Sequence, residues 1–346
     1  MNVLQTIEIT DQLVHTFVLS LAAFLLAMFL TPIYTFFAYR FKFWKKQRST
    51  TTTGEKLQVF NKLHAKKFER NIPTMAGIIF IIAIAVTTLF NLNRGQTWLP
   101  LAALLGGALV GLLDDIINLR GNGSGSAGLR SSVKFSLITA LGLLLGWWFF
   151  ERNGVSSIFV PFIGDISIGW GIIPLFAFAV VATGNAVNIS DGLDGLAGGL
   201  LSLSYSTFGV IALMQGQVFL AGFCFTVVGA LLSYVWFNIY PARFFMGDVG
   251  SFSLGAVLGV VAILTNTLFL LPIIGIIFVI EAGSSAIQII SKKYFGRKVF
   301  ISAPIHHHFE AVGWPETKVT MRFWVIGAVA GFMGVLLALA GGVIGG

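Results

Sequence analysis

Five aspartates stand where the apolar stretches of the sequence break: Asp114, Asp115, Asp191, Asp194 and Asp248. Only 14 of the 346 residues are acidic, so carboxylates at these places need a chemical reason. Neighbouring carboxylates such as Asp114 and Asp115 repel each other, and both stay ionised only near a cation. Oxygen ligands in a chain that has one cysteine suit Mg²⁺ or Mn²⁺. The aspartates therefore predict a metal site that acts on an anionic substrate.

The segment 184–198 surrounds two of these aspartates with two asparagines and four glycines. Glycine lets the backbone approach a ligand closely, and Asn and Asp side chains can bind ribose hydroxyls, base edges or a hydrated metal. A tight turn with side-chain caps explains one Asp and one Gly, but not all eight residues. The segment therefore favours a nucleoside or metal site.

Local structural roles remain open for the other two aspartate motifs. Asp114 and Asp115 could simply end an apolar span with polar residues, although acids in a membrane are costly. Asp248 lies between Gly247 and Gly250 at the start of an apolar segment. A helix N-terminus there can hold a metal ligand or a phosphate, or Asp248 can act as an N-cap.

Three consecutive histidines, His306, His307 and His308, stand in a polar segment near the C-terminus. Consecutive side chains of a regular element cannot all face one ion, so phosphate contacts or proton transfer are the alternatives to metal binding. A histidine cluster without a catalytic role is also open. Glu281 lies inside an apolar stretch with Gln288 two turns later on the same helical face, which favours a structural hydrogen bond over catalysis.

The elements that position these residues are apolar segments long enough to cross a membrane. Hydrophobic residues make up 56% of the chain and charged residues 10%, against about 25% charged in soluble domains. The sole cysteine, Cys224, excludes a disulfide within the chain. We predict an all-α membrane protein, a single polytopic domain over residues 1–346. The ten expected spans are Val14–Ala38, Met75–Phe90, Trp98–Leu113, Val133–Phe150, Gly171–Val187, Leu196–Met214, Val218–Phe237, Ser251–Leu264 (or 246–264), Leu268–Ile290 and Phe323–Ile344.

The basic residues predict the orientation of these spans. With alternating loops, only Arg94 and Arg152 fall on one side, so 20 of the 22 Lys and Arg residues lie on the other, which should be the cytoplasm. Both termini then lie outside, and the segment 156–170 forms a short outer β-hairpin. The basic loop 39–74 is either solvated or forms a helix on the membrane surface.

Four ordered motifs resemble those of the polyprenyl-phosphate N-acetylhexosamine-1-phosphate transferase family, over essentially the whole chain. The motifs are Asp114-Asp115, the run 188–195, Phe-Met-Gly-Asp248 and Pro-Ile-His306-His307-His308-Phe-Glu. The last motif, followed by Gly-Trp-Pro-Glu316, is similar to the branch that makes the first lipid intermediate of peptidoglycan. The resemblance implies ten spans in the bacterial inner membrane and an active site that faces the cytoplasm.

The implied reaction transfers phospho-N-acetylmuramoyl-pentapeptide from UDP-N-acetylmuramoyl-pentapeptide to undecaprenyl phosphate. It releases UMP and uses Mg²⁺. The resemblance implies that Asp248 binds Mg²⁺, that Asp114 and Asp115 activate or position the lipid phosphate, and that the three histidines close on the diphosphate or the sugar. Phe245 would stack on uracil. The other implied substrate-binding residues are Thr74, Lys134, Asn188, Asp191, Gly192, Leu193, Asp194 and Asn238. The protein is expected to lie in a lipid bilayer and not to bind nucleic acid. Its oligomeric state stays open, and a homodimer is one of the alternatives.

Two positions depart from the family pattern, because Glu69 and Asn118 stand where lysine is usual. Arg70 and Arg120 are the candidate substitutes, and nucleotide affinity is the property most affected. We expect a single in-line displacement, since a phosphate monoester is mostly a dianion at about pH 7. A covalent phospho-aspartyl intermediate is the rival mechanism.

Two other functions stay open from the residues alone. A sibling transferase would use UDP-N-acetylglucosamine, although the histidine motif argues against it. An ion-coupled transporter would place its acids near the middle of the membrane, often in repeated halves. Here the acids stand at span ends, and the sequence shows no such repeat.

Overall fold

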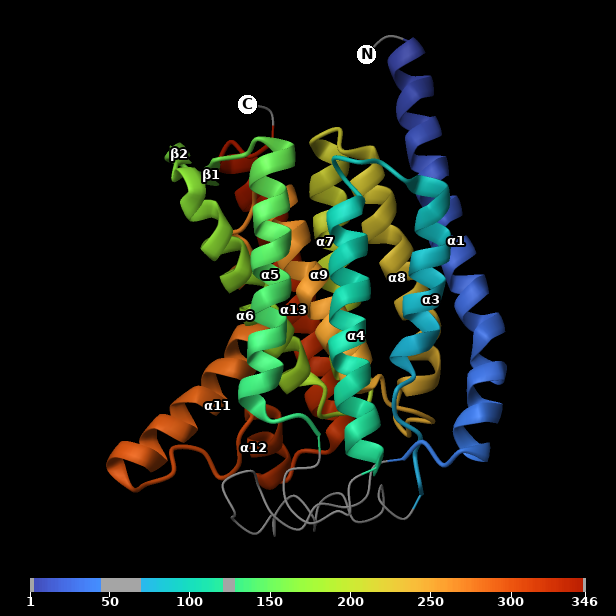
Figure 1. Ribbon diagram of the computed structural model, residues 1–346, viewed down its shortest axis with the longest axis vertical. Helices are drawn as coiled ribbons and strands as arrows, with labels where there is room; N and C mark the ends of the chain where they lie inside the picture. Colours follow the sequence, from blue (N-terminus) through green and yellow to red (C-terminus); the bar gives the residue numbers. More distant parts are fainter. Residues whose placement is uncertain (1–2, 45–69, 121–127, 345–346) are drawn as a thin grey trace.

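The chain is mostly helical, with one small sheet (Figure 1). The computed structural model describes residues 3–44, 70–120 and 128–344, and side chains from residue 10 onward. The helices are α1 (Val3–Arg40), α3 (Gly77–Thr88), α4 (Trp98–Arg120), α5 (Ser131–Asn153), α6 (Ile172–Ser190), α7 (Leu196–Met214), α8 (Val218–Asn238), α9 (Gly247–Leu264), α10 (Leu271–Ile274), α11 (Ile276–Phe295), α12 (Ile305–Ala311) and α13 (Glu316–Ala340). Short 3₁₀ turns cover Leu89–Asn91 and Gly169–Gly171, and the strands are β1 (Ser157–Val160) and β2 (Gly164–Ser167).

Eight helices of the described chain are long and apolar enough to cross a membrane. They correspond to α1, α4, α5, α6, α7, α8, α9 and α13. The expected second span is a shorter apolar helix, Gly77–Asn91. The expected ninth span is two helices, because the chain breaks at Gly275 between α10 and α11. The membrane class is therefore confirmed, and the count of ten spans stays a prediction.

Small residues bring α9 into the centre of the bundle, between α4 and α6. Gly107 and Gly111 of α4 lie directly against the α9 backbone, and Gly255 of α9 lies against Gly184 of α6. Helices pack closely in a membrane where residues lack bulky side chains. Almost every residue of α9 is buried as a result. This packing fixes the two helices that carry the acidic residues relative to each other.

Bulky apolar side chains cover the outside of the bundle. On α1, Phe17, Leu21 and Phe29 are well over half exposed, and Phe332 of α13 is 72% exposed. Such a surface would aggregate in water but suits the hydrocarbon of a bilayer. The sequence explains it, because the long apolar runs within α1 and α13 place bulky apolar side chains on every side of each helix.

The start of α1, the end of α13 and the β-hairpin lie at the same end of the bundle, whereas α12 and the last turns of α4 lie at the other (Figure 1). The hairpin confirms the strand prediction, with antiparallel pairing from Ser157–Ser167 to Val160–Gly164. A hydrogen bond from the Phe162 N–H to the Gly341 carbonyl ties the hairpin to the chain end. α11 slants outward from the lower part of the bundle.

At two boundaries the structure differs from the first sequence estimate, and both matter for the site. The third span was expected to end at Leu113, but α4 continues to Arg120, so Asp114 and Asp115 lie within a helix. The eighth was expected from Ser251, but α9 begins at Gly247, as the longer alternative had it. Both helices continue through these polar residues because the aspartates find partners on neighbouring helices: Asp115 pairs with the Val249 N–H, and Asp114 and Asp248 pair with Lys134. The residues of the surface helix expected within the loop 39–74 lie outside the described residues.

Candidate active site

Asp115 holds the beginning of α9 in place. Its Oδ2 accepts a hydrogen bond of 3.0 Å from the Val249 N–H, and its side chain is fully buried. The close contact of Gly111 with the Asp248 carbonyl places Asp115, one turn further along α4, beside this helix start. A carboxylate there satisfies an otherwise unpaired N–H and interacts favourably with the helix dipole. Asp115 is therefore a structural anchor of the acidic cluster.

Asp114 and Asp248 share one ammonium group. Lys134 Nζ lies 3.0 Å from Asp114 Oδ2 and 2.6 Å from Asp248 Oδ2. The other oxygen of Asp114 accepts a 2.7 Å hydrogen bond from the Leu129 N–H. These three charged groups come from the ends of α4, α5 and α9, and we call them the acidic cluster. Its net charge of one negative unit attracts a further cation.

The donors of the acidic cluster fit Mg²⁺. Mg²⁺ needs hard oxygen ligands and is usually held by one or two carboxylates, with waters and substrate phosphates filling the other positions. Asp114 and Asp248 provide two such carboxylates, and an ammonium already bridges them. Within the described part of the chain no group of three His, Cys, Asp or Glu residues could hold a metal alone. The two carboxylates could therefore supply only part of a coordination sphere.

Asn188 links the glycine-rich segment after α6 to the acidic cluster. Its Nδ2 donates to the Ser251 hydroxyl at 2.9 Å, and that hydroxyl donates to the Gly247 carbonyl at 3.1 Å. Asn188 lies on the last turns of α6, where the sequence had suggested a connecting segment. Asp191 and Gly192 follow it and are partly exposed. This arrangement leaves a polar edge beside Asp248.

Asp194 and Asn238 point into the protein and hold the segment after α6. Asp194 Oδ2 accepts from the Ala242 N–H at 2.9 Å. Asn238 uses both ends of its amide, since Oδ1 accepts from the Gly195 N–H at 2.9 Å and Nδ2 donates to the Phe244 carbonyl at 2.8 Å. Both side chains are 2% exposed, and Leu193 is buried as well.

Glu316 adds a contact for which the sequence offered no role. Its Oε1 accepts a 2.6 Å hydrogen bond from the Asp194 N–H, and Thr320 donates to the Asp194 carbonyl at 3.3 Å. The first turn of α13 therefore fixes the same segment from the other side. The sequence signal for this contact was the Gly-Trp-Pro-Glu316 run. The family resemblance included that run but gave Glu316 no role.

Backbone pairing joins the segment before α3 to the segment before α9. Phe245 donates its N–H to the Pro73 carbonyl at 2.8 Å and accepts from Ala76 at 3.0 Å. Thr74 between them is buried; its N–H donates to the Phe43 carbonyl, and its own carbonyl accepts from the Tyr34 hydroxyl. Phe245 itself is partly exposed.

The structure describes Asn118, one of the two positions that depart from the family pattern, and both candidate substitutes, Arg70 and Arg120. Arg70 donates a hydrogen bond of 3.1 Å to the Ala242 carbonyl, and the N–H of the same Ala242 donates to Asp194. Asn118 is buried one turn after Asp114, and Arg120 is exposed. Glu69 lies outside the described residues. Arg70 therefore contacts the loop between α8 and α9 that Asp194 also holds.

Each of the three histidines has a different partner. His306 Nδ1 lies 2.7 Å from Glu281 Oε2, and both side chains are fully buried. His307 Nδ1 lies 2.7 Å from Glu310 Oε2. His308 is partly exposed and accepts a hydrogen bond from the Ile301 N–H. The sequence treated the run as one group, but the helical turn of α12 divides it.

His306 also joins this region to the glycine-rich segment. A Cβ at Gly192 would collide with the His306 ring, so the backbone there approaches the imidazole directly. Glu281, which the sequence had suggested was structural, fixes the ring from its other side. Burial, followed by the neighbouring His306, lowers the pKa of His307 to about 4. His307 is therefore a neutral ring near pH 7.

A family model described as Glycosyl transferase family 4 matches residues 97–266, which contain all five aspartates. Three relatives carry the name phospho-N-acetylmuramoyl-pentapeptide-transferase. That of Chloroflexus aggregans is 38% identical and aligns with 98% of this chain and 93% of its own length. That of Geobacillus sp. (strain WCH70) is 38% identical, with 91% and 95% covered. That of Levilactobacillus brevis is 40% identical, with 80% and 87% covered.

Proposed function

Because the chain belongs to the phospho-N-acetylmuramoyl-pentapeptide-transferase family, we propose that it makes the first lipid-linked intermediate of peptidoglycan. The substrates are UDP-N-acetylmuramoyl-pentapeptide and undecaprenyl phosphate, and the products are the lipid-linked sugar pentapeptide and UMP. The observation that carries this proposal is the pair of carboxylates bridged by Lys134, next to the segment 188–195 and to an apolar surface. A phosphate donor and a lipid acceptor can meet only at such a border.

The proposed reaction is a single displacement at the phosphorus that bears the sugar. An oxygen of the lipid phosphate forms a new P–O bond, and the P–O bond to UMP breaks with its electron pair on the UMP oxygen. The lipid phosphate is mostly a dianion at about pH 7, so it needs little help from a base. Asp114 then positions the lipid phosphate or takes its remaining proton. Asp115 contributes through the helix start that it anchors.

Asp248 is the proposed Mg²⁺ ligand, with Asp114 next to it. When bound, Mg²⁺ offsets charge on the diphosphate and stabilises the leaving UMP. Lys134 compensates the charge of both aspartates, and its ammonium is within reach of a phosphate oxygen placed between them. His308 is proposed to contact the diphosphate or sugar. The fully buried His306 supports the Gly192 backbone instead, and the neutral His307 supports α12 through Glu310.

The nucleoside pocket is proposed around Asn188, Asp191, Gly192 and Phe245, which are all partly exposed. Phe245 provides the stacking surface for uracil. A second set acts through the backbone: Thr74, Leu193, Asp194 and Asn238 are buried and hold the segments that carry the first set. This division refines the sequence prediction, which had named all of them as substrate-binding residues.

We further propose ten spans in the bacterial inner membrane, with the acidic cluster facing the cytoplasm and both termini outside. Two observations support this orientation. α1 begins and α13 ends at the end opposite to the acidic cluster, and most of the described Lys and Arg residues stand in loops or at helix ends on the side of that cluster. The two shorter elements, α3 and the α10–α11 pair, would complete the ten spans.

Release of UMP from different nucleotide sugars tests the function directly. Purified protein receives a fluorescent polyprenyl phosphate and either UDP-N-acetylmuramoyl-pentapeptide or UDP-N-acetylglucosamine. We expect UMP and a labelled lipid product with the first donor alone. Product from the second donor alone would indicate the sibling transferase instead. Uptake of a solute into liposomes without any UMP release would indicate a transporter.

A further inference from the structure

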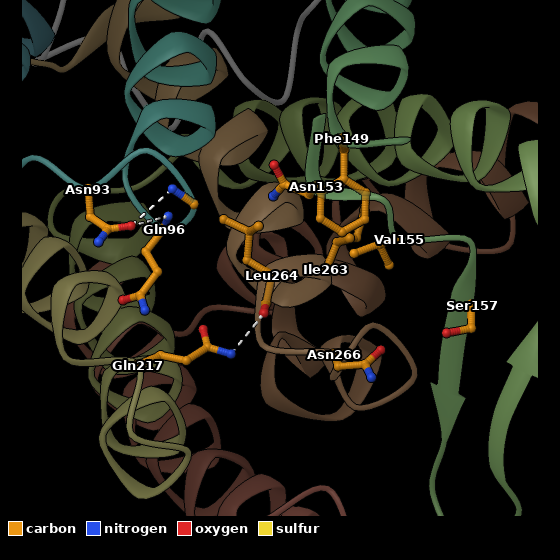
Figure 2. A pocket seen from close by; sticks show the side chains of 11 residues that line it. Asn93, Gln96, Phe149, Asn153, Val155, Ser157, Gln217, Ile263, Leu264 and Asn266 are labelled. Carbon is orange, nitrogen blue, oxygen red and sulfur yellow. Dashed lines mark hydrogen bonds between the residues drawn. The ribbon is translucent and has the colours of Figure 1, made fainter. Parts of the chain in front are cut away.

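A cavity of about 430 Å³ lies at the hairpin end of the bundle, far from the acidic cluster (Figure 2). Gln96, one of its lining residues, stands just before α4. Asp114 is 16 residues further along that helix than Trp98, or about 24 Å at 1.5 Å per residue. The volume falls in the range of about 300–1,000 Å³ typical of ligand pockets. The cavity is therefore separate from the site of phosphoryl transfer.

Carboxamide side chains from four places in the sequence converge on this cavity (Figure 2). They are Asn93 and Gln96 before α4, Asn153 at the end of α5, Gln217 before α8 and Asn266 after α9. Among the described residues, none that lines the cavity carries a charge. Phosphates, carboxylates and metal ions would lose their hydration there without a compensating charge, so an uncharged ligand fits best.

The two carboxamides before α4 are oriented by the backbone. Asn93 Oδ1 accepts from the Gly95 N–H at 2.9 Å and the Gln96 N–H at 3.1 Å. Gln96 Oε1 accepts from the Leu220 N–H at 3.0 Å. Each side chain thus uses its oxygen to hold a loop and keeps its NH₂ group for another partner. The two groups offer hydrogen-bond donors in fixed directions.

The remaining carboxamides complete the pattern. Asn266 Oδ1 accepts from the Phe159 N–H at 3.0 Å, and Gln217 Nε2 donates to the Leu264 carbonyl at 3.2 Å. Asn153 makes no side-chain hydrogen bond to the part of the chain that the structure describes. The cavity thus has NH₂ donors from Asn266 and Asn153, and carbonyl acceptors from Gln217 and Asn153. Donors outnumber acceptors once Asn93 and Gln96 are included.

We propose that this cavity binds a neutral saccharide that carries a carbonyl group, such as an N-acetylated amino sugar. Each sugar hydroxyl both donates and accepts, which matches carboxamides, and the acetamido carbonyl suits the excess of NH₂ donors. Phe149, Val155, Ile263 and Leu264 provide an apolar surface for the C–H face of a sugar ring. An extended peptide would instead pair with a strand edge. In the proposed orientation the cavity opens on the outer side of the membrane.

Saturation-transfer NMR with N,N′-diacetylchitobiose tests the proposal on the intact chain in nanodiscs. No nucleotide sugar or lipid phosphate is present, so the result does not depend on the proposed reaction. We expect transfer to the acetamido methyl and ring protons, with binding at millimolar concentrations. Asn153→Ala should weaken binding roughly three- to tenfold, as the loss of one or two neutral hydrogen bonds would.

Two neighbouring serines provide a matched pair of variants. Ser157 lines the cavity and Ser156 does not, so Ser157→Phe should abolish the saccharide signal and Ser156→Phe should keep it. UMP release by both variants reports that the bundle is folded. The absence of a saccharide signal in the wild type, or an undiminished signal in Ser157→Phe, would overturn the proposal. Binding of a blocked neutral tripeptide in place of the saccharide would overturn the ligand class.

Discussion

The Lys134 ammonium lies 2.6 Å from the Asp248 carboxylate. A metal ion bound by Asp248 would have to contact the same carboxylate. The same ammonium contacts Asp114, so it compensates part of the charge that attracts a divalent ion. Lys134 and a metal therefore compete for two carboxylates. The ammonium also offsets part of the cost of placing two carboxylates side by side at this depth.

Lys134→Met should strengthen the binding of divalent cations while it lowers activity. Removing the ammonium leaves two negative charges, and we expect Mn²⁺ affinity to rise about tenfold, which corresponds to roughly 1.4 kcal/mol. An electron paramagnetic resonance titration with Mn²⁺ measures this change. Lys293→Met, an exposed lysine of α11, is the matched control. Unchanged Mn²⁺ affinity in Lys134→Met would show that the ammonium does not compete.

Glu281→Leu should lower kcat with little change in KM for the nucleotide sugar. The substitution removes the acceptor that fixes the fully buried His306 ring, so the ring can turn away from its working orientation. We expect a loss of about 10- to 100-fold, in the range of a misplaced catalytic group. Glu281→Gln keeps an acceptor oxygen and should retain more activity. Equal activity of the Leu and Gln variants would argue against a positioning role.

Gly192→Ala should impair activity through the same histidine. A Cβ at this position would collide with the His306 ring, so the loop or the ring must move. We expect at least a tenfold loss of kcat/KM in UMP release. Gly283→Ala, on α11 in open space, is the control and should behave like the wild type. Full activity of Gly192→Ala would mean that the contact of Gly192 with His306 does not matter for catalysis.

His307 should make the folded protein less stable in acid. Burial and the neighbouring His306 lower its pKa to about 4, against about 6.5 in an unfolded chain, although Glu310 and Glu281 oppose the shift. As the pH falls from 6.5 to 4, the unfolded state takes up a proton that the folded state refuses, so stability decreases by up to about 3 kcal/mol.

The thermal unfolding midpoint between pH 7 and pH 4 measures this effect. His307→Gln removes the titration and should show a smaller decrease in the midpoint than the wild type. His15→Gln, at an exposed histidine of α1, should follow the wild type. A decrease of equal size in all three proteins would assign the acid sensitivity to other groups.

The sequence predicted the helices well because their apolar runs are long and uninterrupted. It placed the end of α4 too early, since Asp114 and Asp115 look like the end of a span until Lys134 and the Val249 N–H are available as partners. Such partners come from residues far apart in the chain. The break at Gly275 was missed for a related reason, because composition does not reveal a change of direction.

The candidate site was predictable in its members but not in its connections. Motifs singled out Asp248 and His306, and the family resemblance added Asn238. The contact of Glu281 with a histidine 25 residues later, however, requires the folded chain. The amide-lined cavity gave no sequence signal at all. Its asparagines and glutamines stand singly in separate loops, and only the fold brings them together.

UMP release by an Asp248→Asn variant across a series of Mg²⁺ concentrations tests the central claim most directly. Asp165→Asn, an exposed aspartate of the hairpin, is the matched control. The account predicts that the wild type and Asp165→Asn release UMP only with lipid phosphate, UDP-N-acetylmuramoyl-pentapeptide and Mg²⁺ together. Asp248→Asn should be at least about 10³-fold slower at every Mg²⁺ concentration, as expected for the loss of a catalytic metal ligand. Wild-type rates in Asp248→Asn would contradict the account.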